Sequence, residues 1–311
     1  MPINPNQVNL YTISKNELGQ RIDNFLLRVL KKVPKSKIYR IIRKGEVRVN
    51  KKRIKPEYKL QIGDVVRIPP IKIEETKESV DIPPKWIDSV KKSIIVEDDN
   101  LIAINKPSGL GVHSGSHASY GLIEIIRHIR SDDNYLELVH RLDLETSGVV
   151  LIAKSRVVLQ ELHELLRDGH KIEKYYTTLV KGRWKRGKQR LSHKLERQNN
   201  QAKKVNVSEE GKASTSIFEP KKYLKGSTLM EVQILTGRTH QIRTQLAHLK
   251  HPIIGDRMYG DKYTNEKFAQ KYGLKRLFLH ASRMVFILKG KKYEVGAALP
   301  QELYRILKNF N

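Results

Sequence analysis

Hydrophobic residues in the first part of the chain recur three or four positions apart, the spacing of an amphipathic helix. The pattern comprises Ile22, Phe25, Leu26, Val29 and Leu30. A second helix is predicted from Lys37 to Lys44, with Ser36 as its cap and Gly45 at its end. Residues 47–49 and 65–68 have the pattern of short strands. Because the first ten residues are polar and predict a loose lead-in, we expect a small domain over residues 12–70.

A second pattern begins near residue 91, after a segment with charges of both signs and two Pro-Pro pairs. We interpret residues 71–90 as a linker. Hydrophobic runs at 94–96 and 101–104 predict a hairpin, and a helix is expected from Ser155 to Gly169. Further strands are predicted at 175–180, 214–219, 228–235, 282–288 and 291–297, with a helix at 239–249. Residues 91–311 therefore predict an α+β fold with a mixed, largely antiparallel sheet, from which the polar segment 185–212 extends as an exposed arm.

The chain is strongly basic: 60 Lys and Arg against 33 Asp and Glu give a formal charge of +27. Such a balance predicts a polyanionic partner. The second predicted helix has an apolar side, which leaves a basic stripe formed by Lys37, Arg40, Arg43 and Lys44. A solvated charged face is the simpler interpretation of such a stripe. The neighbouring strands carry still more Lys and Arg, which favours a binding surface.

Several classes of protein are excluded by what the sequence lacks. With no cysteine there is no disulfide framework, no thiolate nucleophile and no Cys-ligated zinc. No apolar run reaches the ~18 residues of a membrane span and no N-terminal signal pattern appears, so we expect a soluble, cytoplasmic protein. His248 and His251 lie three positions apart but lack a third ligand nearby, so we expect no metal site.

The segment 140–148 is polar although it lies between two predicted buried strands, 136–139 and 149–153. A loop between two core strands is fixed by its neighbours, so it would hold Asp143 rigidly at the end of a sheet. That is what a positioned nucleophile or base requires. The alternative is that Asp143, Thr146 and Ser147 only satisfy the hydrogen bonds of a turn.

Two other segments place polar residues where a plain core would not need them. Residues 236–243 leave a strand and enter a helix with two arginines and a histidine. An arginine that reaches an internal carboxylate keeps it charged, although salt bridges at the surface are the commoner use of arginine. Residues 105–113 form a Gly-rich turn without the spacing of a phosphate-binding loop, which we interpret as backbone shaping beside the site.

These segments resemble the large-subunit ribosomal RNA pseudouridine synthases. Residues 140–148 match the His-Arg-Leu-Asp-x-x-Thr-Ser-Gly signature of that family, and residues 237–243 match its Gly-Arg-Thr-His-Gln-Ile-Arg segment. Asn105-Lys106-Pro107, Lys174-x-Tyr176, His251-Pro252 with Gly255-Asp256, and Leu279-His280-Ala281 follow in the family's order. Residues 34–40 and 43–56 resemble the S-four-type RNA-binding module that many of these synthases carry.

The resemblance implies a role for each of several residues. Asp143 would be the catalytic aspartate and Arg243 its ion-pair partner. Tyr176 would be a third catalytic residue, packed against a flipped uracil and a candidate for proton transfer. For substrate binding it implies an apolar wall at Leu279, a side chain at Arg141 that fills the gap in the RNA stack, and contacts from His140, Arg40, Arg43 and Lys44. The partner would be large-subunit ribosomal RNA, bound by a monomer that needs no redox cofactor, ATP or metal.

Two alternatives belong to other classes. A non-catalytic RNA-binding or ribosome-assembly protein would need only the basic first domain, but it has no use for an acid in a basic loop. A hydrolase of glycosidic bonds would need two carboxylates that flank the bond, and Glu145 is the only near candidate for the second. For an isomerase, the sequence leaves open whether Asp143 attacks C1′, deprotonates the ribose or engages the base.

Overall fold

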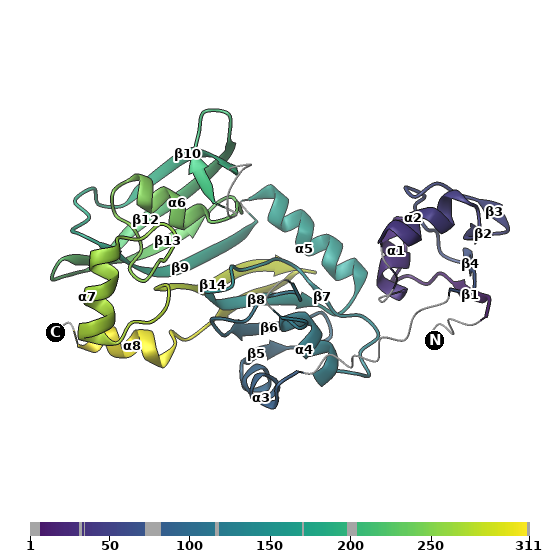
Figure 1. Ribbon diagram of the computed structural model, residues 1–311, viewed down its shortest axis with the longest axis horizontal. Helices are drawn as coiled ribbons and strands as arrows, with labels where there is room; N and C mark the ends of the chain where they lie inside the picture. Colours follow the sequence, from purple (N-terminus) through teal and green to yellow (C-terminus); the bar gives the residue numbers. More distant parts are fainter. Residues whose placement is uncertain are drawn as a thin grey trace. The chain divides into compact units, whose positions relative to one another are not determined.

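The chain forms two compact units, one within the first 79 residues and one in the rest of the chain. The computed structural model describes residues 7–30, 33, 35–71, 82–115, 118–169, 171–197 and 204–309 (Figure 1). Each unit has its own hydrophobic core.

The first unit packs two helices on a small antiparallel sheet with the strand order β1-β4-β2-β3. Its elements are β1 (Asn9–Thr12), α1 (Ile22–Val29), α2 (Lys35–Arg43), β2 (Arg48–Val49), β3 (Lys52–Arg53) and β4 (Val65–Ile68). On α2 the isoleucines of the apolar side are at most 4% exposed, whereas Arg40 and Arg43, and Lys44 just after the helix, are exposed. Three of the four residues of the predicted basic stripe are therefore exposed on this unit, and the fourth, Lys37, is partly buried.

The end of the lead-in is more ordered than its sequence predicts, whereas residues 1–6 lie outside the described part of the chain. We expected a loose segment in the first ten residues, but β1 begins at Asn9 and pairs with β4. The pairing places Tyr11 edge-on against Phe25, with ring centroids 5.0 Å apart, while Leu10 on the other face stays 70% exposed. Because this edge strand buries only one side of four residues, its hydrophobic pattern was too short to recognise.

The second unit is built on one long mixed sheet. Its described strands follow the order β11-β10-β12-β13-β9-β14-β8-β6-β5, with β15 paired to β14 and β7 to β8. All of these pairs are antiparallel except β14 with β8, so the predicted fold class is confirmed. The elements are α3 (Pro84–Lys92), β5 (Ile94–Glu97), β6 (Leu101–Lys106), α4 (Leu122–Ile129), β7 (Glu137–Leu138), β8 (Ser147–Ala153), α5 (Arg156–Asp168), β9 (Ile172–Lys181), β10 (Gln189–Arg197), β11 (Val205–Val207), β12 (Lys212–Leu224), β13 (Ser227–Ile234), α6 (Gln241–His248), α7 (Lys262–Tyr272), β14 (Leu279–Leu288), β15 (Lys291–Gly296) and α8 (Gln301–Lys308).

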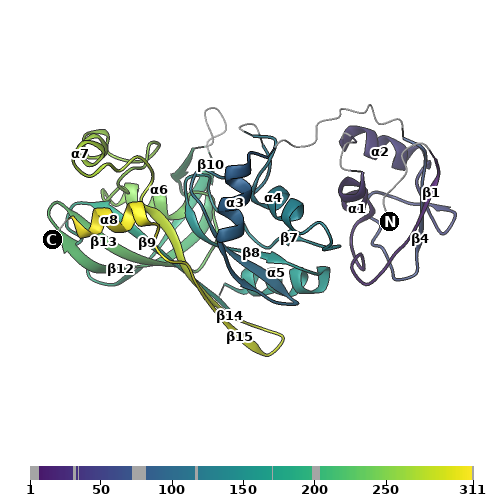
Figure 2. The ribbon, with the colours of Figure 1, turned by 90° about the horizontal axis from the view of Figure 1, so that it is seen from below.

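Helices cover both faces of the sheet around β6 and β8. Alternate residues of these strands face opposite sides. Leu101 and Leu151 pack with α5, whereas Ile102 and Ile152 pack with α3 and α4 on the other face (Figure 2). All seven residues of β8 are therefore buried, which accounts for its uninterrupted apolar run. A third core joins β9, β12 and β13 to α6, α7 and α8.

Two segments of this unit differ from their predictions. Helix α3 lies in the expected linker, and its Val90 is fully buried against α4. The described residues of the segment 185–212 are largely exposed, as predicted, but β10 and β11 extend the sheet within this segment, which was not predicted. Residues 198–203 lie outside the described part. The sequence of β10 is mostly polar because only one of its nine residues, Leu195, is buried.

Candidate active site

The polar segment 140–148 runs from β7 into the first residues of β8, as the sequence predicts. Gly148 has φ +119, and a Cβ there would overlap the backbone of Ala281 on the parallel strand β14. Only glycine permits this close approach of the two strands. The approach brings the first residue of β14, Leu279, beside the segment that carries Asp143.

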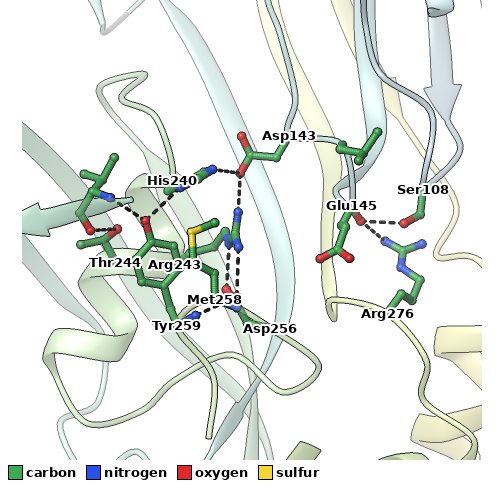
Figure 3. Close-up of polar contacts among 12 residues, drawn as sticks. Ser108, Asp143, Glu145, His240, Arg243, Thr244, Asp256, Met258, Tyr259 and Arg276 are labelled. Atoms are coloured by element: carbon green, nitrogen blue, oxygen red, sulfur yellow. Dashed lines mark hydrogen bonds and ion pairs between the residues drawn. The ribbon is translucent and has the colours of Figure 1, made fainter. Parts of the chain in front are cut away.

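Hydrogen bonds to backbone carbonyl groups hold the segment 140–148 in place. The Lys106 ammonium donates to the carbonyl oxygens of Pro107, Leu110 and Leu144 at 2.9, 2.8 and 3.3 Å. The Glu145 carbonyl accepts from the Ser108 hydroxyl at 2.8 Å and from Arg276 at 3.1 Å (Figure 3). The Gly-rich turn therefore does shape the site, through bonds to the carbonyl groups that follow Asp143.

The carboxylate of Asp143 forms an ion pair with Arg243 of α6. Arg243 Nη1 lies 3.2 Å from Asp143 Oδ2, and the same guanidinium donates to both oxygens of Asp256, at 2.7 and 2.9 Å. Burial by itself would lower the pKa of Arg243, but the hydrogen bonds and charge of Asp256, and then of Asp143, raise it. Burial would raise the pKa of Asp256, and Arg243 and the backbone N–H groups of Met258 and Tyr259 lower it. Arg243 is thus a permanent cation fixed by Asp256 and directed at Asp143.

A histidine approaches the same carboxylate from the start of α6. His240 has the left-handed backbone conformation (φ 53°), and its Nε2 lies 3.7 Å from Asp143 Oδ2. Its Nδ1 lies 2.9 Å from the hydroxyl of Tyr259 (Figure 3). That hydroxyl accepts a hydrogen bond from the backbone N–H of Val205 at 2.8 Å. Burial lowers the pKa of His240, and the charge of Asp143 opposes the shift. These contacts fit the neutral tautomer with its proton on Nε2, directed at Asp143.

These groups open onto a cavity of about 520 Å³. The residues that line it are His140, Arg141, Leu142, Asp143, Thr146, Leu166, Arg167, Lys174, Tyr176, Ile234, Leu235, Thr236, Gly237, Arg238, Thr239, His240, Gln241, Ile242, Arg243 and Leu279. Among these described residues Asp143 is the only acid, and its side chain is 21% exposed. Burial raises the pKa of Tyr176, and the charge of Asp143 adds to the shift, so the phenol stays protonated. The Asp143 carboxylate therefore faces a cavity lined by basic, neutral polar and apolar residues.

Comparison with known proteins decides what this arrangement belongs to. A family model described as RNA pseudouridylate synthase matches residues 100–248, and an S4 domain model matches residues 20–66. The chain is 47% identical over 306 residues to a protein of Pasteurella multocida named ribosomal large subunit pseudouridine synthase C, with 96% of this chain and 93% of that protein covered. It is 45% identical over 307 residues to the protein of that name from Escherichia coli K12, at 97% and 96% coverage. The chain belongs to the RNA pseudouridine synthase family.

The fold agrees with this membership. A solved structure titled Human RNA Pseudouridylate Synthase Domain Containing 4 superposes with a TM-score of 0.61, at 22% identity, over 73% of this chain and 95% of that one. The first-domain segments 34–40 and 43–56 resemble the synthase C type in particular, and the comparisons confirm that resemblance.

The cavity of this synthase brings together most of the residues that the sequence singled out. Asp143, Tyr176, Arg243 and Leu279 line it, and Arg141 does so as an exposed side chain. His140 also lines it, but its Nε2 accepts the backbone N–H of Leu151 at 3.2 Å, so that atom is already engaged. Burial lowers the pKa of His140 to about 4, which keeps it neutral. The other three predicted contacts, Arg40, Arg43 and Lys44, belong to α2 and the residue after it in the first unit.

Two residues that hold the site together had no role in the sequence analysis. Asp256 is fully buried beneath Arg243, and Tyr259 stacks beside the same guanidinium with its ring centroid 5.1 Å away. Their one signal was the family pattern around Gly255-Asp256, which gives no role by itself. An acid remote in sequence from Arg243 is paired with it only once the chain folds.

Two kinds of feature are absent from the part of the chain that the structure describes. None of its helices is long and apolar enough to cross a membrane. It contains no cluster of three or more His, Asp or Glu side chains that could hold a metal ion.

We expect the fold of this synthase to lose stability in mild acid because of His280. This buried histidine donates from Nε2 to the Ala297 carbonyl at 3.0 Å, so its Nδ1 accepts the Ser147 hydroxyl at 2.9 Å. Burial lowers its pKa to about 4, and the charge of Arg276 adds to the shift. In the unfolded chain His280 is protonated below about pH 6.5, whereas in the folded protein it stays neutral down to about pH 4. His280 therefore lowers the free energy of unfolding as pH falls through this range, by about 2 kcal/mol between pH 7 and 5.

The measurement is urea unfolding at pH 7 and pH 5 for the parent and for His280→Gln. The variant should lose roughly 2 kcal/mol of the parent's pH dependence. An equal pH dependence in both proteins would show that His280 does not titrate in this way.

Proposed function

We propose that this protein isomerises specific uridines of large-subunit (23S) ribosomal RNA to pseudouridine, with Asp143 as the catalytic carboxylate. The observation that carries the assignment of Asp143 is its position as the only acid among the described residues that line a basic cavity, paired with the buried Arg243. The choice of RNA rests on relatives 45–48% identical over most of the chain, whose printed names specify the ribosomal large subunit.

Four other lining residues have proposed roles in binding the target nucleotide. Tyr176 packs against the flipped uracil, and Leu279, which is 4% exposed, forms an apolar wall of its pocket. Arg141 is exposed and enters the space that the uridine leaves in the RNA stack, with His140 beside it. Unstacking a base costs a few kcal/mol, which such stacking and basic contacts offset.

The reaction needs no second substrate. It breaks the N1–C1′ bond, turns the uracil and joins C1′ to C5, so the product is an isomer of the substrate and nothing is oxidised or reduced. Asp143 serves this reaction by attack at C1′, by removal of a ribose proton or by addition to the base, and each route starts from the ionised carboxylate. We propose that the enzyme is a monomer without a cofactor, because one chain supplies every group named here, and that it acts in the cytoplasm, where its proposed ribosomal substrate lies.

The two alternatives fit the site less well. Among the described residues the cavity has no second carboxylate, and Glu145 does not line it, so a glycosidic hydrolase lacks its acid and base pair. A protein that only binds RNA gains nothing from Asp143, which repels phosphate. The direct test is to map pseudouridines in ribosomal RNA from cells that lack the gene. Specific large-subunit sites should be unmodified and should be restored by the parent gene, whereas an unchanged map would contradict the proposal.

We propose that affinity and chemistry belong to separate domains, with residues 12–70 for binding and residues 91–311 for catalysis, and that α3, which begins within the predicted linker 71–90, belongs to the catalytic domain. The exposed cations of α2 suit phosphate contacts, and the reactive groups all lie in the second unit. Because α3 is part of the second unit's core, a truncated protein should begin at Ile82.

Removal of the first unit is expected to weaken binding of the target RNA by at least about tenfold and to flatten its salt dependence, since fewer counterions are released. Turnover at saturating RNA should persist. The measurement is Kd across a salt series by filter binding, for the parent and for residues 82–311. An unchanged Kd and salt slope in the truncated protein would contradict this division of labour.

A further inference from the structure

Lys174 is a buried cation of the cavity to which no role has been given. It lies two residues before Tyr176 on β9, so both side chains project from the same face of the sheet. Both line the cavity, and Lys174 is only 7% exposed. Among the residues that the structure describes, none forms a hydrogen bond or an ion pair with its ammonium.

The two other buried cations near the site are engaged. Lys106 donates to three carbonyl oxygens, and Arg243 is held between two carboxylates. An unpaired charge in an apolar site is costly, and burial lowers the pKa of Lys174 accordingly. The nearby His140 offers it no acceptor at Nε2, which already accepts the Leu151 N–H. The Lys174 ammonium therefore has no hydrogen-bond acceptor among the described residues, and a molecule bound in the cavity can supply that acceptor.

The position of Lys174 favours the base over the phosphates as that acceptor. Arg141, Arg167 and Arg238 also line the cavity but are exposed, as suits contacts with the RNA backbone. Lys174 instead lies inside, on the same strand face as Tyr176. A uracil packed on Tyr176 brings two carbonyl oxygens into this space.

Building on the proposed function, we propose that Lys174 donates a hydrogen bond to a carbonyl oxygen of the flipped uracil and stabilises its negative charge during isomerisation. When the N1–C1′ bond breaks, its electron pair stays with the uracil and spreads over N1 and the carbonyl oxygens. C5 then forms the bond to C1′, the hydrogen of C5 leaves as a proton, and N1 takes up a proton. Lys174 is unchanged at the end, so nothing is oxidised or reduced.

The test replaces Lys174 by methionine, which has a similar length and no charge. The rate of a single turnover at saturating RNA should fall about 100- to 1,000-fold, as when one donor to a developing oxyanion is removed. The Kd for RNA should stay within about threefold, and the melting temperature should stay equal or rise, because an unpaired buried charge is removed. Lys174→Gln keeps a donor without the charge and should give an intermediate rate.

The matched control is Lys181→Met on the same strand, where the lysine is 43% exposed and paired with Asp261. That variant should turn over at the parent's rate. Three results would overturn the role of Lys174: a Lys174→Met rate within about threefold of the parent's, a loss of affinity with the rate at saturation retained, as for a phosphate contact, or a fall in melting temperature of more than about 5 °C, as for a structural residue. If the parent itself forms no pseudouridine, the proposed function fails instead.

Discussion

Replacing Arg243 by methionine is expected to lower the free energy of unfolding by about 3–5 kcal/mol at neutral pH and to abolish turnover. Arg243 lies between Asp143 and Asp256, and the Asp256 side chain is completely buried. Without the guanidinium, two carboxylates are left close together, one of them buried without a cation. The variant therefore loses stability because Asp256 is left without its cation, and it loses turnover because Asp143 is no longer held in its orientation.

The pH dependence distinguishes this cause from a simple packing defect. In the parent the pKa of Asp256 is lowered, so its stabilising effect is present above the ordinary aspartate pKa of about 4 and is lost as pH falls below it. In Arg243→Met the buried carboxylate is destabilising, and protonation relieves it. The difference in unfolding free energy between parent and variant should therefore shrink as pH falls from 7 to 5.

The control for this experiment is Arg238→Met. Arg238 lies five residues earlier in the same segment and is exposed, with one side-chain hydrogen bond to the Ala213 carbonyl at 3.3 Å. Its removal should change the unfolding free energy by less than about 1 kcal/mol. The buried ion-pair network would be contradicted if Arg243→Met lowered the free energy of unfolding by no more than Arg238→Met does, or by an amount independent of pH.

The sequence predicted those parts of the fold whose hydrophobic pattern is local. The hairpin of β5 and β6, helix α5 and the strands β9, β12, β13, β14 and β15 have periods that a single segment reveals. Helix α3 and strand β10 were missed for opposite reasons. α3 is short and rich in charge, and it becomes part of the core only through α4, whereas β10 is a strand that buries almost nothing.

The candidate site was predictable to the extent that its chemistry is local in sequence. A carboxylate in a loop between core strands, and arginines at a helix start, pointed to Asp143 and Arg243. The sequence did not predict the residues that hold this site in place, because Asp256, Tyr259 and Arg276 reach it from other segments only when the chain folds. No pattern along the chain indicates that Lys174 lacks a partner among the described residues, since that depends on everything packed around it.

Asp143→Asn should eliminate isomerisation while leaving the protein folded and able to bind RNA. The change keeps the shape of the side chain but removes its charge and its nucleophilic oxygen. Arg243 retains both bonds to Asp256, so the expected cost in stability is only about 1 kcal/mol. The expected loss of rate is at least about 1,000-fold, which corresponds to about 4 kcal/mol of barrier.

Glu145→Gln is the matched control, because it removes an acid from the same loop that does not line the cavity. Its side chain has no role in the proposed chemistry, so this variant should form pseudouridine at a rate within about threefold of the parent's. Circular dichroism and a binding assay on the same preparations separate a catalytic defect from a folding or binding defect.

The central claim, that Asp143 is the catalytic carboxylate of a pseudouridine synthase, is tested most directly by the pseudouridine formed in a large-subunit RNA fragment under single-turnover conditions. Parent, Asp143→Asn and Glu145→Gln are compared at the same fraction of RNA bound. The account predicts product with the parent and with Glu145→Gln and none with Asp143→Asn. Pseudouridine formed by Asp143→Asn at a rate within about tenfold of the parent's, a difference of only about 1.4 kcal/mol in the barrier, would contradict it.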